Sequence, residues 1–171
     1  MKKVVLVFSL LLSLTTFAQT KVAHVNTQKL LDTLPSRKEA MKQLSAFEQK
    51  GAGELKEMEE ELQKVYSKYM ADQATLTPVM KQYEEERIQK KSQAIQQREQ
   101  ELQQLMQKMG NELNEPILKR VQKAVERVAA AKKINYVIDE STTLYFKGGQ
   151  DVTSEVMVEL LKLDAIEAPK K

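Results

Sequence analysis

The sequence has no cysteine and no tryptophan, and it contains few glycines, prolines and aromatic residues. Without cysteine, the chain can form neither a disulfide framework nor a thiol nucleophile, so packing or self-association must stabilise it. The single histidine, His24, lies in a short β-type run with no ligand spacing around it, which predicts a packed strand residue. Gly148 and Gly149 lack the spacing of a phosphate-binding loop and predict a turn. The sequence therefore predicts no enzyme activity, no metal site and no cofactor.

The N-terminus has the pattern of a secretory signal. Lys2 and Lys3 precede an apolar run at 4–14, and Thr16 and Ala18 are small residues that suit a signal peptidase. The run is too short to cross a membrane, so it predicts cleavage near Ala18 and export of a soluble mature chain; an uncleaved anchor is the alternative. Removing the two signal lysines leaves 25 basic and 24 acidic residues, a net charge near +1. This balance gives no support to nucleic-acid binding.

Apolar residues recur seven positions apart in two stretches, which is typical of a coiled-coil seam. The first stretch follows Ser36, and the second follows Pro78. Pro78, with Thr77 as a candidate N-cap, predicts the start of a return helix. Residues 36–116 therefore predict an antiparallel helical hairpin with a turn near 75–78. The predicted seam residues are Leu44, Gly51, Leu55, Met58, Leu62, Val65 and Tyr69, then Ile88, Ile95, Leu102, Leu105, Met106, Met109 and Leu113.

Three local patterns concern the ends and interiors of these helices. The Ser-x-x-Glu pattern at 36–39 predicts a capping box. Gly51 and Gly53 predict either a soft point in the first helix or a local break. Pro116 predicts a kink in the return helix or a restart capped by Asn114.

The rest of the chain predicts a β-rich body made of 19–35 and 117–165, followed by a disordered tail at 166–171. Strand-like runs are predicted at 21–26, 134–139 and 144–146, with a short helix or turn at 27–34. Asp151 is predicted to cap a final helix that buries Val152, Val156, Leu160 and Leu163, after an apolar stripe at Ile117, Val121, Ala124, Val125, Val128 and Ala129. The fold class is α+β. A sheet this small needs partners, which predicts an oligomer, such as a trimer.

The run RVQKAVERVAAAKKINYVID at 120–139, followed by Tyr145 and DVT at 151–153, resembles the C-terminal signature of the Skp/OmpH family of periplasmic chaperones. KVAHVN at 21–26 resembles the first strand of that family, and MEEELQ at 58–63 resembles its first arm. The resemblance implies a jellyfish-like homotrimer, in which three hairpin arms on a β-rich trimerisation body enclose a cavity. It also implies an ATP-independent holdase that binds unfolded outer-membrane β-barrel proteins and prevents their aggregation.

The chain departs from the family pattern in its charges. Well-studied members are strongly basic, whereas this chain is near neutral once processed. Adjacent arginines proposed to bind lipopolysaccharide in the family correspond to Lys108 and Met109 here, so the resemblance does not carry that site over. The basic stretch at 119–133 is either a contact for anionic lipid or a solvated helix face.

Candidate client-binding residues lie near the predicted turn and along the return helix. Methionine side chains there suit adaptable contact with varied apolar sequences. Basic residues on the return helix either line the cavity and attract acidic clients or only solvate the helix. The candidates are Met70, Leu76, Val79, Met80, Arg87, Lys90, Lys91 and Arg98. The alternative function is a structural coiled-coil spacer or adaptor in the cell envelope, which would bind folded partners.

Overall fold

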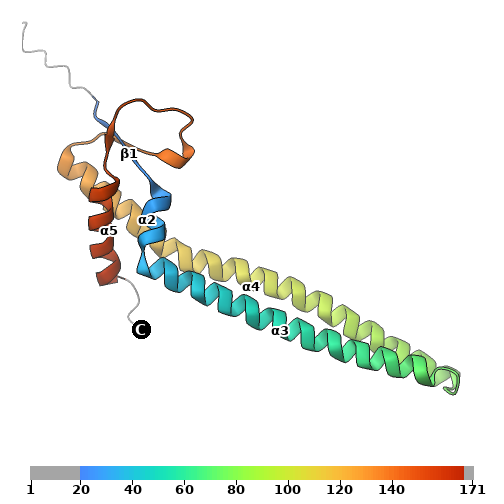
Figure 1. The fold of residues 1–171 in the computed structure, drawn as a ribbon. Coiled ribbons are helices and arrows are strands. Elements are labelled where there is room, and N and C mark those ends of the chain that lie inside the picture. Colours follow the sequence, from blue (N-terminus) through green and yellow to red (C-terminus); the bar gives the residue numbers. More distant parts are fainter. Residues whose placement is uncertain (1–19, 168–171) are drawn as a thin grey trace, which may run out of the picture. The chain divides into compact units, whose positions relative to one another are not determined.

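The computed structural model describes residues 20–167, which form two compact units (Figure 1). The hairpin unit consists of 32–120 together with 164–167, and the body unit consists of 20–31 together with 121–163. The predicted signal at 1–18 lies outside the described residues. Within the described range, no helix is both long enough and apolar enough to cross a membrane.

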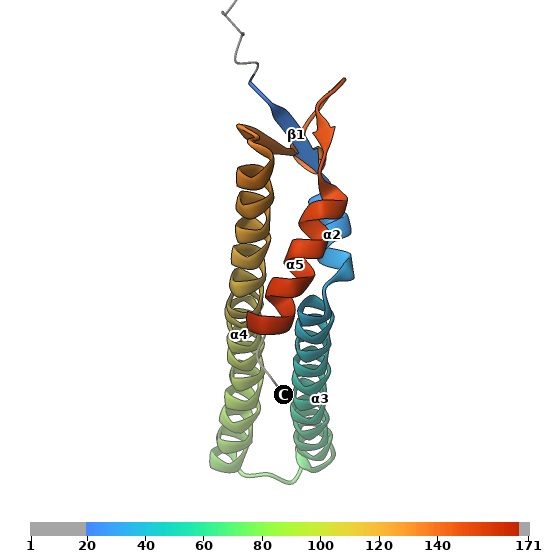
Figure 2. The same ribbon diagram turned by 90° about the vertical axis from the view of Figure 1, so that its left-hand side faces the viewer.

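Two long antiparallel helices build the hairpin unit and lie side by side (Figure 2). Helix α3 (Pro35–Asp72) runs to the turn at 73–77, and α4 (Pro78–Lys132) returns; its residues up to Arg120 belong to this unit. The Thr77 hydroxyl accepts a hydrogen bond from the Met80 backbone N–H at 3.3 Å, which confirms the predicted cap. The predicted seam residues are buried or half-buried, except Leu105, which is exposed. The heptad pattern therefore identified the packed face of the hairpin.

The predicted capping box at the start of α3 is wrong. The helix begins at Pro35, and the N-cap residue, Leu34, makes no side-chain capping bond. Ser36 lies in the first turn, where its N–H donates to Asp164 Oδ2 at 3.2 Å and its hydroxyl accepts from Arg120 Nη2 at 3.1 Å. Ser36 therefore hydrogen-bonds to two buried charged residues instead of capping the helix, because a buried charge is costly without hydrogen-bond partners.

Neither glycine nor proline interrupts the long helices. Helix α3 passes through Gly51 and Gly53 without a break, and α4 passes through Pro116 without the restart at Asn114 that was one expectation. Proline removes one backbone hydrogen bond from a helix interior. Burial of Ile117 beside it offsets that loss, since Ile117 is only 2% exposed.

The two glycines of α3 should respond differently to alanine. A Cβ at Gly53 would meet no atom within 4 Å, whereas one at Gly51 would lie 3.2 Å from both terminal methyl carbons of Leu102. We expect Gly53→Ala to raise the free energy of unfolding by about 1 kcal/mol, because alanine is the better helix former. Gly51→Ala should raise the free energy of unfolding by less, because the Leu102 side chain must move to make room for the added Cβ. Urea unfolding followed by circular dichroism compares the two, and an equal or larger gain at Gly51 would contradict this packing.

The body unit contains a three-stranded parallel sheet with the strand order β2-β1-β3. Its strands are β1 (Val22–Val25), β2 (Tyr136–Asp139) and β3 (Gln150–Asp151). The strand expected at 144–146 is wrong. Those residues form an exposed loop after the short 3-10 helix η1 (Glu140–Thr142), and the third strand comes later. Gly148 and Gly149 have φ angles of 103° and 90°, so the predicted turn needs glycine there.

Helices supply most of the core of the body unit. They are α2 (Thr27–Thr33), the C-terminal end of α4, and α5 (Thr153–Glu167). The four residues predicted to be buried by the final helix are buried, although Val152 precedes α5. Asp151 is the last residue of β3, and its Oδ1 accepts a hydrogen bond from the N–H of Thr153, the first residue of α5, at 2.8 Å. Helix α5 extends two residues into the predicted tail, and 168–171 lie outside the described residues. The buried apolar residues of this unit are Ala23, Val25, Leu30, Val121, Ala124, Val128, Val152, Val156, Leu160 and Leu163.

Candidate functional site

Exposed apolar side chains gather around the turn of the hairpin. Met70, Val79 and Met80 are 51%, 77% and 52% exposed, and Leu76 is half-buried. Tyr83 is exposed on the same helix as Val79 and Met80, and the sequence reasoning did not single it out. Neighbouring exposed apolar groups of this kind mark surfaces that contact another molecule. The turn end of the hairpin is therefore the candidate binding surface.

The side chain of Tyr69 fastens the two helices just before this turn. It is 7% exposed, and its hydroxyl donates to Glu85 Oε1 at 2.6 Å. The hydrogen bond to Glu85 raises the pKa of Tyr69, and burial raises it further. The hydroxyl therefore stays protonated and joins α3 to α4 by a hydrogen bond close to the exposed residues of the turn.

Two of the predicted basic residues join the helices. Lys91 Nζ lies 2.7 Å from Glu61 Oε2, and Arg98 Nη2 lies 2.7 Å from Glu54 Oε2. These partners come from α3, so the charges of Lys91 and Arg98 are offset within the hairpin. Their contribution to client binding stays a prediction, and both residues also form ion pairs that join α3 to α4.

The same ion pairs lower the pKa of two carboxylates. The hydrogen bond from Arg98 lowers the pKa of Glu54 and outweighs the opposing effect of desolvation. Lys91 lowers the pKa of Glu61 in the same way. Both carboxylates are therefore ionised and paired at neutral pH.

These lowered pKa values predict weakening of the hairpin in acid. A carboxylate with a lowered folded-state pKa stabilises the fold above its unfolded pKa, near 4.5, and loses that contribution as the pH falls through the folded value. We expect the urea midpoint to fall between pH 6 and pH 3. Glu54→Gln combined with Glu61→Gln should reduce the drop, because amides do not titrate. An identical pH dependence in this double variant would contradict the assignment.

Among the described residues, the other two predicted basic residues, Arg87 and Lys90, form no ion pair with α3. Arg87 pairs with Glu84 at 3.3 Å, whereas Lys90 has no ion-pair partner among residues 20–167. Together with Lys91 and Tyr83, they line a shallow hollow of about 290 Å³. The structure thus brings three of the predicted basic residues together beside an aromatic ring, a surface suited to mixed polar and apolar segments.

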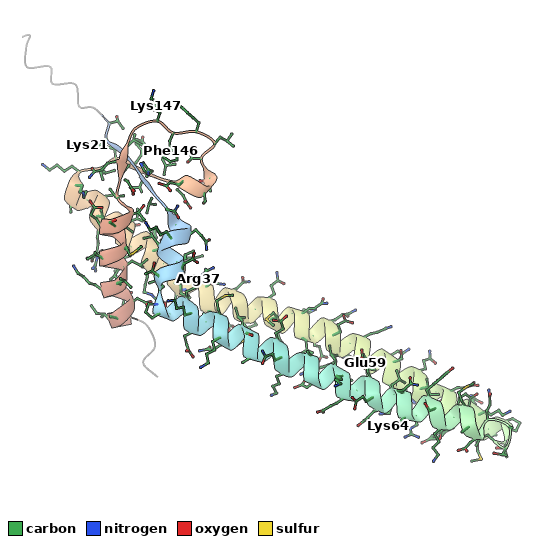
Figure 3. The ribbon with its side chains drawn as sticks, in the orientation of Figure 1. Lys21, Arg37, Glu59, Lys64, Phe146 and Lys147 are labelled. Atoms are coloured by element: carbon green, nitrogen blue, oxygen red, sulfur yellow. The ribbon has the colours of Figure 1, made fainter. Side chains whose placement is uncertain are left out.

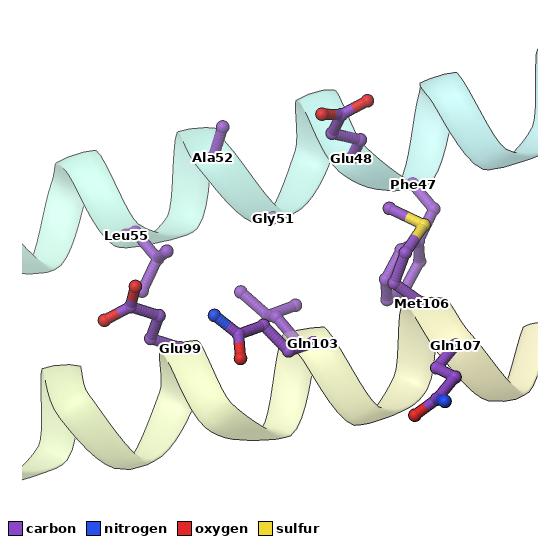
Figure 4. Close-up of a pocket in the computed structure, with 10 residues that line it drawn as sticks. Phe47, Glu48, Gly51, Ala52, Leu55, Glu99, Gln103, Met106 and Gln107 are labelled. Carbon is purple, nitrogen blue, oxygen red and sulfur yellow. The ribbon is translucent and has the colours of Figure 1, made fainter.

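An apolar groove between the helices was missed by the sequence reasoning. It has a volume of about 470 Å³, and its floor contains Phe47, Gly51, Leu55 and Met106 (Figure 4). Gly51 opens this space because it contributes no side chain opposite Leu102. A glycine at a seam position was the signal that could have indicated it. Polar side chains form the rim: Glu48, Glu99, Gln103 and Gln107.

The outer faces of the hairpin are polar. Glu59 and Lys64 extend from α3 into solvent (Figure 3). Several exposed charged or amide side chains form short-range pairs within one helix, such as Lys56 with Glu60. Such pairs contribute little to stability but keep the hairpin hydrated.

The basic stretch at 119–133 is largely neutralised by acidic partners. Arg127 pairs with Glu159 at 2.6 Å within the body unit, and Lys119 pairs with Glu115 at 2.6 Å within the hairpin unit. Lys132 likewise pairs with Glu155, and Arg120 with Asp164. These pairs favour the solvated-face interpretation over a lipid-binding patch.

Comparison with known proteins agrees with this architecture. Residues 21–160 match the model of the family described as outer membrane protein (OmpH-like). The chaperone protein Skp of Yersinia pseudotuberculosis is 33% identical over 140 residues, which are 82% of this chain and 85% of that protein, and Skp of Photorhabdus laumondii is 28% identical over the same shares. A solved OmpH-like outer membrane chaperone of Caulobacter crescentus superposes with a TM-score of 0.74 at 17% identity, covering 90% of this chain and 89% of that one. Since the family model spans most of the sequence, this chain belongs to the OmpH-like outer membrane protein family.

Proposed function

We propose that the protein is an ATP-independent periplasmic holdase that binds unfolded outer-membrane β-barrel proteins and prevents their aggregation. Its curated relatives are named as chaperones. The observation that carries the proposal is a long polar hairpin that exposes Met70, Val79 and Met80 around its turn. A chaperone for varied chains needs adaptable apolar contacts on a hydrated support, and thioethers supply them.

The holdase acts as a homotrimer in this proposal. The body unit exposes apolar side chains on β1, β2 and the loop that follows η1, and its sheet has only three short strands. A sheet of this size gains stability when it packs against further surface. Contact with two other copies would cover the exposed residues Val22, Tyr136, Ile138, Leu144, Tyr145 and Phe146.

The binding mechanism is multivalent capture. Each turn end and each groove offers a weak contact, and three hairpins around one client raise the effective concentration of those contacts. Single contacts release quickly, so the client stays unfolded while it is shielded. Insertion of the client into the membrane is the thermodynamic sink, so no nucleotide is required.

Photo-crosslinking tests where clients bind. A photoreactive amino acid at positions 70, 76 or 80 should capture a urea-unfolded outer-membrane barrel on dilution. The matched control is position 59, an exposed site on the same hairpin where Glu59 extends into solvent (Figure 3). Equal capture at 59, or none at the three turn positions, would contradict binding at the turn. Capture of one folded envelope protein in a fixed ratio would instead indicate a spacer or adaptor.

A further inference from the structure

The parallel sheet of the body unit brings three potential metal ligands together. His24 on the central strand β1 is paired in register with Ile138 of β2 and with Asp151 of β3. Glu140 is the first residue of η1, directly after β2 ends, and its carboxylate reaches the imidazole of His24. The imidazole, the Glu140 carboxylate and the Asp151 carboxylate each offer one atom, and these atoms all lie within 4.8 Å of one another. Along the sequence, His24 had no ligand spacing around it, because its neighbours come from the other end of the chain.

The separations suit one small ion. His24 Nδ1 lies 2.7 Å from Glu140 Oε1. Zinc binds imidazole nitrogen and carboxylate oxygen at about 2.0–2.2 Å, which places two tetrahedral ligands about 3.4 Å apart. The His24 and Glu140 atoms would have to move apart by about 0.7 Å to bind one ion together with Asp151, which would leave a fourth position for water.

Other groups already orient both carboxylates. Glu140 Oε2 accepts a hydrogen bond from Asn26 Nδ2 at 2.9 Å, which leaves Oε1 directed at His24. Asp151 Oδ1 accepts from the Thr153 N–H at 2.8 Å, and the Thr153 side chain also hydrogen-bonds to this carboxylate. Such outer partners fix the geometry of metal ligands in proteins.

Partial burial of His24 and Glu140 and the excess negative charge of the cluster also favour a cation, whereas Asp151 lies at the exposed side of the cluster. The side chains of His24 and Glu140 are 16% and 23% exposed, and the Phe146 ring lies 4.7 Å from the imidazole, centroid to centroid. Figure 3 shows Phe146 on the loop that follows η1. Two carboxylates lie beside one imidazole, so the cluster carries negative charge that a bound cation would offset. Lys29 adds a positive charge that acts on Asp151, yet it cannot occupy the space between the three ligand atoms in the way that an ion can.

We propose that His24, Glu140 and Asp151 bind a divalent transition-metal ion of the Zn²⁺ class and thereby tie the three strand segments of the body unit together. A nitrogen ligand beside two carboxylates favours Zn²⁺ over Mg²⁺ or Ca²⁺, which prefer all-oxygen sites. The inference is independent of holdase activity, because the ion stabilises the body unit and need not touch a client.

The single histidine makes the test direct. With the full mature chain and no histidine tag, zinc chloride should shift the one imidazole signal in the NMR spectrum and saturate at one ion per chain. We expect a dissociation constant below about 10 µM by calorimetry, because three protein ligands would hold the ion. When the free zinc concentration is about one hundred times the dissociation constant, the melting temperature should rise by about 5 °C or more. Millimolar Mg²⁺ should not compete.

Two conservative variants isolate the ligands. Asp151→Asn keeps an oxygen for the Thr153 N–H, and Glu140→Gln keeps an oxygen for His24 or Asn26, while each removes a carboxylate. Each should weaken zinc binding at least about tenfold. Glu155→Gln is the control, since this carboxylate of α5 pairs with Lys132 and should leave binding unchanged. No imidazole shift at 100 µM zinc, or equal binding by wild type and Asp151→Asn, would overturn the proposal and leave His24 with only its hydrogen bond to Glu140.

Discussion

Replacing Asp164 with alanine is expected to destabilise the protein by about 3–5 kcal/mol, the usual cost of leaving one charge of a buried pair without its partner. Arg120 and Asp164 are 4% and 3% exposed, and Arg120 Nε lies 3.2 Å from Asp164 Oδ1. That contact is an ion pair without hydrogen-bond geometry, so the pair depends on Ser36, which bonds to both residues. Loss of the carboxylate would leave the guanidinium buried with the Ser36 hydroxyl alone.

Urea unfolding at one fixed protomer concentration measures this effect, since an oligomer's stability depends on concentration. Glu115→Ala is the matched control, because its pair with Lys119 is exposed and should change stability by less than about 1 kcal/mol. The double variant Arg120→Met with Asp164→Leu should recover most of the loss, since well-packed apolar groups often replace buried ion pairs without cost. A loss below 1 kcal/mol for Asp164→Ala would show that solvent reaches Arg120.

The second large effect concerns client affinity. We expect the triple variant Met70→Gln, Val79→Thr and Met80→Gln to bind unfolded clients at least about tenfold more weakly. Each exposed side chain contributes on the order of 1 kcal/mol when a client covers it, and 1.4 kcal/mol corresponds to a factor of ten. The free energy of unfolding should change little, because all three side chains are at least half exposed in the free protein.

Fluorescence anisotropy with a labelled, urea-unfolded barrel measures that affinity. The control variant combines Glu59→Gln with Lys64→Gln, which alters two exposed residues of the same hairpin and leaves the net charge unchanged. Its affinity should match the wild type. If the triple variant stays within twofold of wild type, the turn is not a client-binding surface and the groove at Gly51 becomes the candidate.

The sequence predicted the hairpin well because its information is local. Heptad spacing placed the seam, and Thr77 with Pro78 placed the start of the return helix. The body was predicted less well, because β-type residues at 144–146 were read as a strand. Leu144 and Tyr145 are 105% and 77% exposed, so these residues are free to pair with other surfaces instead of the chain's own sheet.

Interactions between distant segments could not be predicted from the sequence. The Ser-x-x-Glu pattern at 36–39 indicated a local cap, yet Ser36 bonds to Arg120 and Asp164 because their burial demands partners. His24 meets Glu140 across 116 positions, through a sheet register that no spacing along the chain reveals. In the candidate site, the exposed apolar residues could be predicted because methionine and other apolar side chains stand beside the predicted turn. The pairing of Lys91 and Arg98 with α3 needed the structure.

The proposed function is to keep unfolded barrel proteins from aggregating without an energy source. The most direct test dilutes a urea-unfolded outer-membrane barrel into increasing amounts of the mature chain, residues 19–171, without nucleotide, and follows light scattering. Suppression that saturates near three protomers per client is the predicted result. Undiminished scattering from a sample in which the protein itself is folded and oligomeric would contradict the holdase and favour the spacer.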